Sequence, residues 1–294
     1  MNLAVTSSNT YSLIDSGDGR RLEKFGINTI VRPDSTCIWH PQEPKGEWLS
    51  ATAVYNKKEG VRSCWNNKQM LKPPWECVFA LPGGPSGKGC RIVMSLRLGG
   101  SKNVGIFPEQ QSNWDWIAQT LRRGPQAKVL NLFGYTGGAT LAAAAQGAEV
   151  CHVDASKTAV TWARENQMLS GLEKAHIRWI EDDCLSFMRR EIKRGVRYDA
   201  IIMDPPAFGR DHKGNAFSFE DQIHPLLKAA KDLLSDKPRF FLINGYAMGY
   251  PADVLGNLVR EHFPKQEVEC GELQIMQEDK SRVISCSIYA RVTW

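Results

Sequence analysis

The chain predicts an α/β fold, a doubly wound and mostly parallel sheet preceded by a small strand-rich α+β domain. Two observations in the sequence indicate this. Predicted strands and helices alternate over about 120 residues after Gly124-Pro125, which is typical of a parallel sheet with helices on both faces. The first third instead holds short β-prone runs separated by turn-forming segments.

The rear part carries the stronger pattern. Lys128–Phe133 is a continuous apolar run of the kind found in strands that are buried on both faces. We expect further strands at 149–154, 175–180, 198–204 and 239–244, with helices at 139–146, 156–169, 184–193 and 219–234. The tail, 266–275 and 282–292, predicts an antiparallel hairpin at the edge of the sheet.

The front part reads as antiparallel strands. Leu49–Tyr55, Cys77–Leu81 and Ile92–Leu98 are β-prone, and segments rich in glycine and proline separate them. We place the domain boundary so that residues 1–112 form the α+β domain and residues 113–294 the catalytic domain.

Composition argues against a membrane-spanning, a secreted and a metal-binding protein. No run approaches the roughly 18 uncharged apolar residues of a membrane span, and the first ten residues do not resemble a secretory signal. The eight cysteines are never closer than 13 residues, and the six histidines show no paired metal spacing. We therefore expect a cytoplasmic protein with reduced cysteines and without a bound metal.

The charge is unevenly distributed along the chain. Residues 1–128 hold 17 Lys+Arg against 10 Asp+Glu, whereas residues 129–294 hold 20 against 22. A basic front half favours docking of a polyanion such as RNA, although an ordinary solvated surface with surplus lysine gives the same count.

A glycine turn and an acid suggest a nucleoside-containing cofactor. Asn131–Gly138 (NLFGYTGG) follows the first strand of the rear part, and Asp154 ends the next strand 20 residues after Gly134. A carboxylate there can accept hydrogen bonds from both ribose hydroxyls. The pair alone also fits a nicotinamide dinucleotide, but Thr136 replaces the second glycine of GxGxxG, which a pyrophosphate requires. S-adenosylmethionine has no pyrophosphate and does not need that glycine.

Two further strand ends carry acids. Asp182 and Asp183 follow the third strand, where a carboxylate can accept from an adenine amino group or can cap the next helix. The fourth strand ends in Asp204-Pro205-Pro206-Ala207-Phe208, whose prolines stiffen the chain and remove two amide donors. Phe208 could stack on a base, and Arg210 with His212 and Lys213 could contact a phosphate or lie exposed.

These motifs resemble a bacterial family of 23S ribosomal RNA methyltransferases that act on cytosine C5 or guanine N7. The resemblance rests on VLNLFGYTGGATLAAAAQGAEVCHVDAS, WARENQMLSGL, EDDCLSFM and YDAIIMDPPAFGR, and it covers about residues 76–245. It implies a class I methyltransferase with a Rossmann-like fold that binds S-adenosyl-L-methionine. The RNA-binding module that usually begins such proteins is not recognisable here.

The resemblance also implies roles for individual residues. Phe107 and Gln110 would touch the cofactor, Tyr135 and Gly137 would hold its methionine part, and Asp183 its adenine. Together with the residues of the strand ends, the expected cofactor site is Phe107, Gln110, Asn131, Phe133, Tyr135, Thr136, Gly137, Gly138, Asp154, Ala155, Asp182, Asp183 and Asp204. The expected substrate site is Pro206, Phe208, Arg210 and Tyr246.

The mechanism is expected to differ from that of the cytosine C5 enzymes. Methylation at C5 requires a cysteine that attacks C6. The resemblance implies that this cysteine follows the fifth strand, but Phe241–Ala247 contains none. The alternative position, just after the proline of the fourth-strand motif, is Ala207. We expect direct transfer to a base nitrogen of RNA, in which Asp204, Pro205 and Asn244 orient the acceptor.

Other classes remain open at this stage. A methyltransferase acting on protein or on a small molecule would share the cofactor motifs. A nicotinamide-dependent oxidoreductase would need the missing glycine, and an inactive RNA-binding module would have no reason to keep an acid at each strand end. The sequence leaves the oligomeric state unknown.

Overall fold

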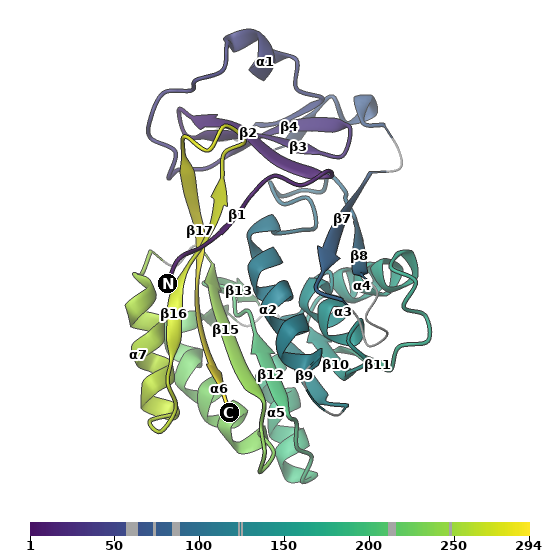
Figure 1. Ribbon diagram of the computed structural model, residues 1–294, viewed down its shortest axis with the longest axis vertical. Helices are drawn as coiled ribbons and strands as arrows, with labels where there is room; N and C mark the ends of the chain where they lie inside the picture. Colours follow the sequence, from purple (N-terminus) through teal and green to yellow (C-terminus); the bar gives the residue numbers. More distant parts are fainter. Residues whose placement is uncertain are drawn as a thin grey trace.

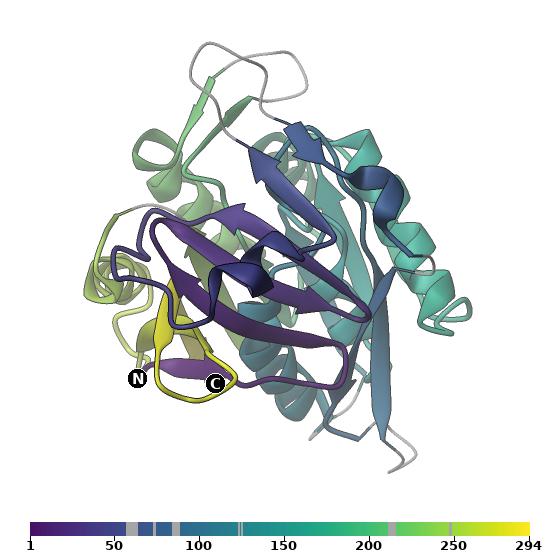
Figure 2. The same ribbon diagram turned by 90° about the horizontal axis from the view of Figure 1, so that it is seen from above.

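The computed structural model describes residues 1–56, 64–72, 75–83, 89–122, 124, 126–210, 216–246 and 249–294. Figure 1 shows a strand-rich part at the top and a larger α/β part below it. Seen from above, the strand-rich part lies across the rest of the chain (Figure 2).

An eight-stranded sheet forms the centre of the α/β part. Its strand order is β1-β16-β17-β15-β12-β9-β10-β11. The strands are β1 (Leu3–Val5), β9 (Lys128–Leu132), β10 (Glu149–Asp154), β11 (Ile177–Glu181), β12 (Ala200–Met203), β15 (Phe240–Tyr246), β16 (Glu269–Met276) and β17 (Val283–Thr293). The five neighbouring strands β15, β12, β9, β10 and β11 run parallel. Strand β17 pairs antiparallel with both β15 and β16. The predicted doubly wound sheet with a C-terminal hairpin is confirmed.

Helices cover both faces of this sheet. They are α2 (Gln111–Arg122), α3 (Gly138–Ala144), α4 (Lys157–Leu169), α5 (Cys184–Lys193), α6 (Phe219–Leu233) and α7 (Ala252–His262). Side chains of α5, α6 and α7 pack with Leu130 and Ile201 on one face, and those of α2 and α3 pack with Val129 and Ile202 on the other. This burial on both faces explains why the central strands are apolar throughout.

The strand-rich part holds two units, which are antiparallel except that β4 and β5 pair parallel. A five-stranded sheet, the front sheet, has the order β2-β3-β4-β5-β6, and β7 and β8 form a separate pair. These elements are β2 (Tyr11–Gly17), β3 (Arg20–Phe25), β4 (Asn28–Pro33), α1 (Lys45–Leu49), β5 (Ala53–Asn56), β6 (Cys64–Asn66), η1 (Lys68–Met70), β7 (Glu76–Leu81) and β8 (Cys90–Ser95). The 3-10 turn η2 (Pro108–Gln110) then leads into α2. Among the described residues of the first hundred, only those of β1 join the large sheet.

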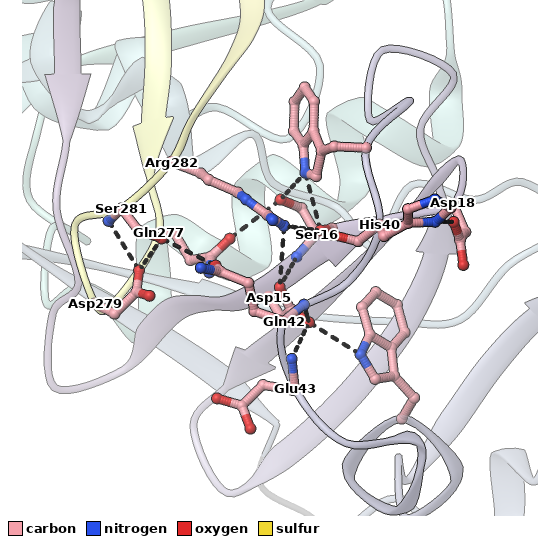
Figure 3. Close-up of polar contacts among 12 residues, drawn as sticks. Asp15, Ser16, Asp18, His40, Gln42, Glu43, Gln277, Asp279, Ser281 and Arg282 are labelled. Atoms are coloured by element: carbon pink, nitrogen blue, oxygen red, sulfur yellow. Dashed lines mark hydrogen bonds and ion pairs between the residues drawn. The ribbon is translucent and has the colours of Figure 1, made fainter.

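The tip of the β16–β17 hairpin fastens the front sheet to the α/β part (Figure 3). Arg282 donates to the backbone oxygens of Ser16 and His40 at 3.0 and 2.9 Å, and Gln277 donates to Gln42 at 2.7 Å. Asp15, fully buried beside them, lies 3.8 Å from Arg282. These contacts join segments more than 200 residues apart in the chain.

Asp15 organises the loop that these contacts need. One of its carboxylate oxygens accepts from the backbone amides of Gln42 and Glu43 at 3.0 and 2.8 Å and from the Trp48 indole at 3.2 Å. Several donors therefore share one buried carboxylate, and they would lose their partner together if its charge were removed.

We expect Asp15→Asn to lower the free energy of unfolding by about 2–4 kcal/mol, because an amide nitrogen would face donors that now bind an anion. Urea denaturation measures the loss. Asp18→Asn is the matched control, since the Asp18 side chain pairs, among the described residues, only with the exposed His40 and such surface pairs contribute little. Equal stability of the two variants would contradict the role given to Asp15.

Candidate cofactor and methyl-transfer site

A cavity of about 570 Å³ lies where β9, β10 and β12 end. This is the edge at which open parallel sheets bind ligands. Of the residues expected from sequence, the cavity is lined by Phe107, Gln110, Phe133, Tyr135, Asp154, Ala155, Asp183, Asp204, Pro205, Pro206 and Tyr246. A second, smaller cavity of about 60 Å³ shares five of these residues and adds the expected Asn131, Thr136, Gly138 and Asn244.

The turn after β9 is tightly constrained. Phe133 and Tyr135 have φ angles of 57° and 48°, in the left-handed region that side chains other than glycine rarely adopt. Between them, a Cβ on Gly134 would lie 2.4 Å from the His152 ring, so only glycine fits. The backbone amide of Tyr135 donates to Asp154 at 2.8 Å, which ties the turn to the end of β10.

Asp154 has spare hydrogen-bonding capacity toward the cavity. Its two carboxylate oxygens accept from the Tyr135 and Ser156 amides, both at 2.8 Å, and each oxygen keeps a second acceptor position. Burial raises the pKa of Asp154, while these two amide donors oppose the rise. A carboxylate with one free acceptor position on each oxygen suits a pair of neighbouring hydroxyls.

Asp183 and Asp182 have different surroundings. Asp183 caps α5 by accepting from the Ser186 amide at 2.8 Å, and it also lines the cavity, so the cap and the cavity position coexist. Asp182 forms an ion pair with Arg190 and does not line either cavity.

Asp204 lies at the end of β12 and lines both cavities. Burial, reinforced by the nearby Glu109 carboxylate, raises the pKa of Asp204 to about 7. The carboxyl group therefore changes its charge near neutral pH, which is unusual for aspartate and is typical of functional sites.

Aromatic rings form much of the cavity wall. The Phe107 ring lies 5.1 Å from that of Tyr246 and 5.8 Å from that of Tyr135, and Phe133 lies 5.7 Å from Phe217. Burial raises the pKa of Tyr246 to about 12, with Glu109 adding to the rise, so its hydroxyl stays protonated.

Two of the remaining expected residues, Phe208 and Gly137, do not line either cavity. Phe208 is 77% exposed on β13 (Phe208–Arg210), which pairs with β14 (Ala216–Ser218). The backbone of Arg210 ends β13, and His212 and Lys213 lie outside the described residues. Gly137 has a φ angle of 92° and begins α3 without contributing to a cavity wall.

Sequence reasoning missed part of the lining. Asn103, Ser156, Cys184, Gly209 and Phe217 also line the large cavity. Ser156 and Cys184 directly follow expected residues and could have been found by adjacency. Phe217 had no sequence signal, because its place depends on the pairing of β13 with β14.

The distribution of cysteines limits the chemistry. Of the eight cysteines, Cys184 alone lines the large cavity. It is 2% exposed and accepts from the Phe133 amide at 3.3 Å, and burial raises the pKa of its thiol well above the usual value. A protonated thiol beside Asp154 and Asp183 is a poor nucleophile.

The residues present fit S-adenosylmethionine. Carboxylates at the ends of β10 and β11 can accept from ribose and adenine, and the turn after the neighbouring β9 admits no added Cβ at Gly134. Such an arrangement of acids and turn on a doubly wound sheet defines a class I methyltransferase. The family model of S-adenosylmethionine-dependent methyltransferases matches residues 87–272, and the chain belongs to this family.

A solved structure is similar over the whole chain. The S-adenosylmethionine-dependent methyltransferase from Agrobacterium tumefaciens is 36% identical with a TM-score of 0.89, and the match covers 100% of this chain and 93% of that one. The chain is thus similar to an enzyme of this class in both its strand-rich and its α/β parts.

Curated relatives match over shorter segments. Ribosomal RNA large subunit methyltransferase I from Aeromonas salmonicida is 36% identical over 41% of this chain and 29% of its own length. Ribosomal RNA large subunit methyltransferase K/L from Methylococcus capsulatus is 36% identical over 45% of this chain and 18% of its own length. The chain therefore spans less than a third of either relative.

One cluster of metal-ligating groups lies outside the cavity. His224 on α6 and Glu261 and His262 on α7 bring their ligand atoms within 4.8 Å of one another, and the two imidazole nitrogens are 3.5 Å apart. None of the three lines either cavity. His224 and His262 are 38 positions apart, so spacing rules along the sequence do not reveal this cluster. Among the described residues, no helix is long and apolar enough to cross a membrane.

We expect Asp154→Asn to weaken binding of S-adenosylhomocysteine by about 10–100-fold, because charged acceptors contribute about 1.5–3 kcal/mol each. Isothermal titration calorimetry measures this change. Asp221→Asn, an exposed substitution in the first turn of α6, is the control and should bind normally. Unchanged affinity in Asp154→Asn would show that the cofactor lies elsewhere.

Proposed function

We propose that this methyltransferase transfers the methyl group of S-adenosylmethionine directly to a base nitrogen of ribosomal RNA, without a covalent cysteine intermediate. The surroundings of Cys184 carry the mechanistic part of the proposal. Cys184 is the one cysteine that lines the large cavity. Its sulfur accepts a hydrogen bond from the Phe133 amide, and the carboxylates that raise its pKa are those of Asp154 and Asp183 rather than Asp204. Attack on C6 of a pyrimidine therefore has no thiolate to perform it.

The groups around Asp204 suit a nitrogen acceptor. When bound, S-adenosylmethionine supplies an electrophilic methyl group on its sulfonium. Ionised Asp204 can accept an N–H of the base, and the carbonyl of Pro205 can accept a second one, so together they fix the direction of the nitrogen lone pair. Pro206 adds rigidity, because its backbone meets Tyr246 in a parallel bridge.

An RNA acceptor is supported by charge and by the names of the relatives. Two of the front arginines, Arg21 and Arg32, are buried in ion pairs with Asp34 and Glu23. Other described cations of the front part, such as Arg20, Lys24 and Lys45, are exposed. We propose that residues 1–112 dock RNA and that residues 113–294 perform the transfer. Exposed Phe208 on β13, close in sequence to Pro205 and Pro206, offers a ring on which a base could stack.

Methyl transfer to labelled product tests this proposal. The protein is incubated with S-adenosylmethionine labelled in its methyl group and with ribosomal RNA from cells that lack it, and the labelled nucleoside is identified after digestion. Label on a base nitrogen supports the proposal. Label on C5 of cytosine would overturn the direct mechanism, and label in protein or small molecules alone would overturn the RNA acceptor.

We expect kcat/KM for the cofactor to rise as the pH increases through about 7, because Asp204 becomes ionised in this range. Asp204→Asn should lower turnover by about 10²–10⁴-fold and should remove this part of the pH profile. Initial rates from pH 5.5 to 8.5 measure both effects. A variant that kept the same pH dependence would assign it to another group.

A further inference from the structure

Three buried amide side chains form a network, and two of them, Gln110 and Asn244, line the smaller cavity. Asn113 on α2 is 1% exposed, Asn244 on β15 is 3% exposed, and Gln110 in η2 is 9% exposed. The amide nitrogen of Asn113 donates to the oxygen of Asn244 at 2.8 Å and to the oxygen of Gln110 at 3.1 Å. One NH2 group therefore occupies the oxygens of both neighbouring amides.

This arrangement sets what the two neighbours present to the cavity. The oxygens of Gln110 and Asn244 bind Asn113, so their NH2 groups are the ends left for a ligand. Within the described parts of the chain, neither NH2 group has a hydrogen-bond partner, although both residues line the smaller cavity. Unpartnered donors on nearly buried side chains indicate a ligand that accepts hydrogen bonds.

The position of the smaller cavity identifies the part of the ligand. Its wall includes Gly134, Thr136 and Gly138 of the turn after β9, whereas Pro205 and Pro206 line only the large cavity. Its volume of about 60 Å³ is about a tenth of the 570 Å³ of its neighbour, enough for a small polar group rather than for a base. The methionine end of the cofactor carries such a group, a carboxylate with acceptor positions only.

We propose that Asn113 is a positioning residue that turns the NH2 groups of Gln110 and Asn244 into the smaller cavity, where they bind the carboxylate of the cofactor's amino-acid part. Asn113 does not line the cavity and acts through its two neighbours. The opposite orientation of the two amides would set two carbonyl oxygens against an anion. The inference depends on the cofactor class and is independent of the methyl acceptor.

Two ligands separate this role from general support of the fold. S-adenosylhomocysteine carries the amino-acid part, and 5′-methylthioadenosine lacks it while keeping the adenosine. Asn113→Leu removes the shared donor at nearly constant volume. We expect this variant to weaken the binding of S-adenosylhomocysteine by about tenfold or more in calorimetry, equivalent to the loss of one or two hydrogen bonds. The affinity for 5′-methylthioadenosine should change by no more than about twofold.

A control and a second variant complete the experiment. Gln119→Leu changes an exposed amide on the same helix and should bind both ligands normally. Asn113→Asp, measured at pH 8.5, offers only acceptors once ionised, so it should draw the NH2 groups of Gln110 and Asn244 away from the cavity. It should therefore weaken the binding of S-adenosylhomocysteine more than Asn113→Leu does. Equal losses for both ligands, or unchanged binding of S-adenosylhomocysteine by Asn113→Asp, would overturn the proposal.

Discussion

The contact of Gly134 with the His152 ring is the constraint on which the rest of the site depends. It brings the β9 turn so close to β10 that no side chain fits, and the residues on either side adopt left-handed conformations. Such conformations cost of order 1–3 kcal/mol each and persist only where the surroundings fix them. Here His152 is fixed by Thr140 at 2.9 Å, and its burial lowers its pKa to about 3, so the ring stays neutral beneath the turn. The Tyr135 amide consequently points at Asp154, and the strand-end acids face a single cavity.

Charges buried in the front sheet extend this organisation beyond the α/β part. Arg32 binds both oxygens of Glu23 at 2.5 and 2.8 Å, and Arg21 approaches Asp34 at 2.6 Å. Burial favours the neutral form of Glu23, but these arginines prevail and hold its pKa below the usual value. Arg21 also opposes the rise in the pKa of buried Glu109, the carboxylate that raises the pKa of Asp204. The front sheet thus contributes to the electrostatics of the cavity although none of its described residues lines it.

Sequence reasoning succeeded where a local rule determines the structure. Ser156 and Asp183 begin α4 and α5 as caps, and apolar runs gave the central strands to within a few residues. The predictions were less accurate where contacts between segments far apart in the sequence determine the structure. A strand was expected over residues 49–55, but Leu49 is the last residue of α1 and β5 starts only at Ala53. Helix α1 is held there because Trp48 is buried and donates to Asp15. The Asn113 network could not be foreseen, since it joins residues 131 positions apart. Nor did the sequence distinguish Asp182, which pairs with Arg190, from Asp183, which caps α5 and lines the cavity.

The fastening of the front sheet by the β16–β17 hairpin has a consequence for biosynthesis. Residues 11–33 can pair among themselves early, but Asp15, Ser16 and Gln42 gain their contacts with Gln277 and Arg282 only when residues 277–282 have been translated. β1 likewise waits for β16. Pairing between such distant segments is slow because a long loop must close first. On the ribosome, the growing chain therefore contains β9 to β15 before β1 and the front sheet can gain their contacts with the hairpin.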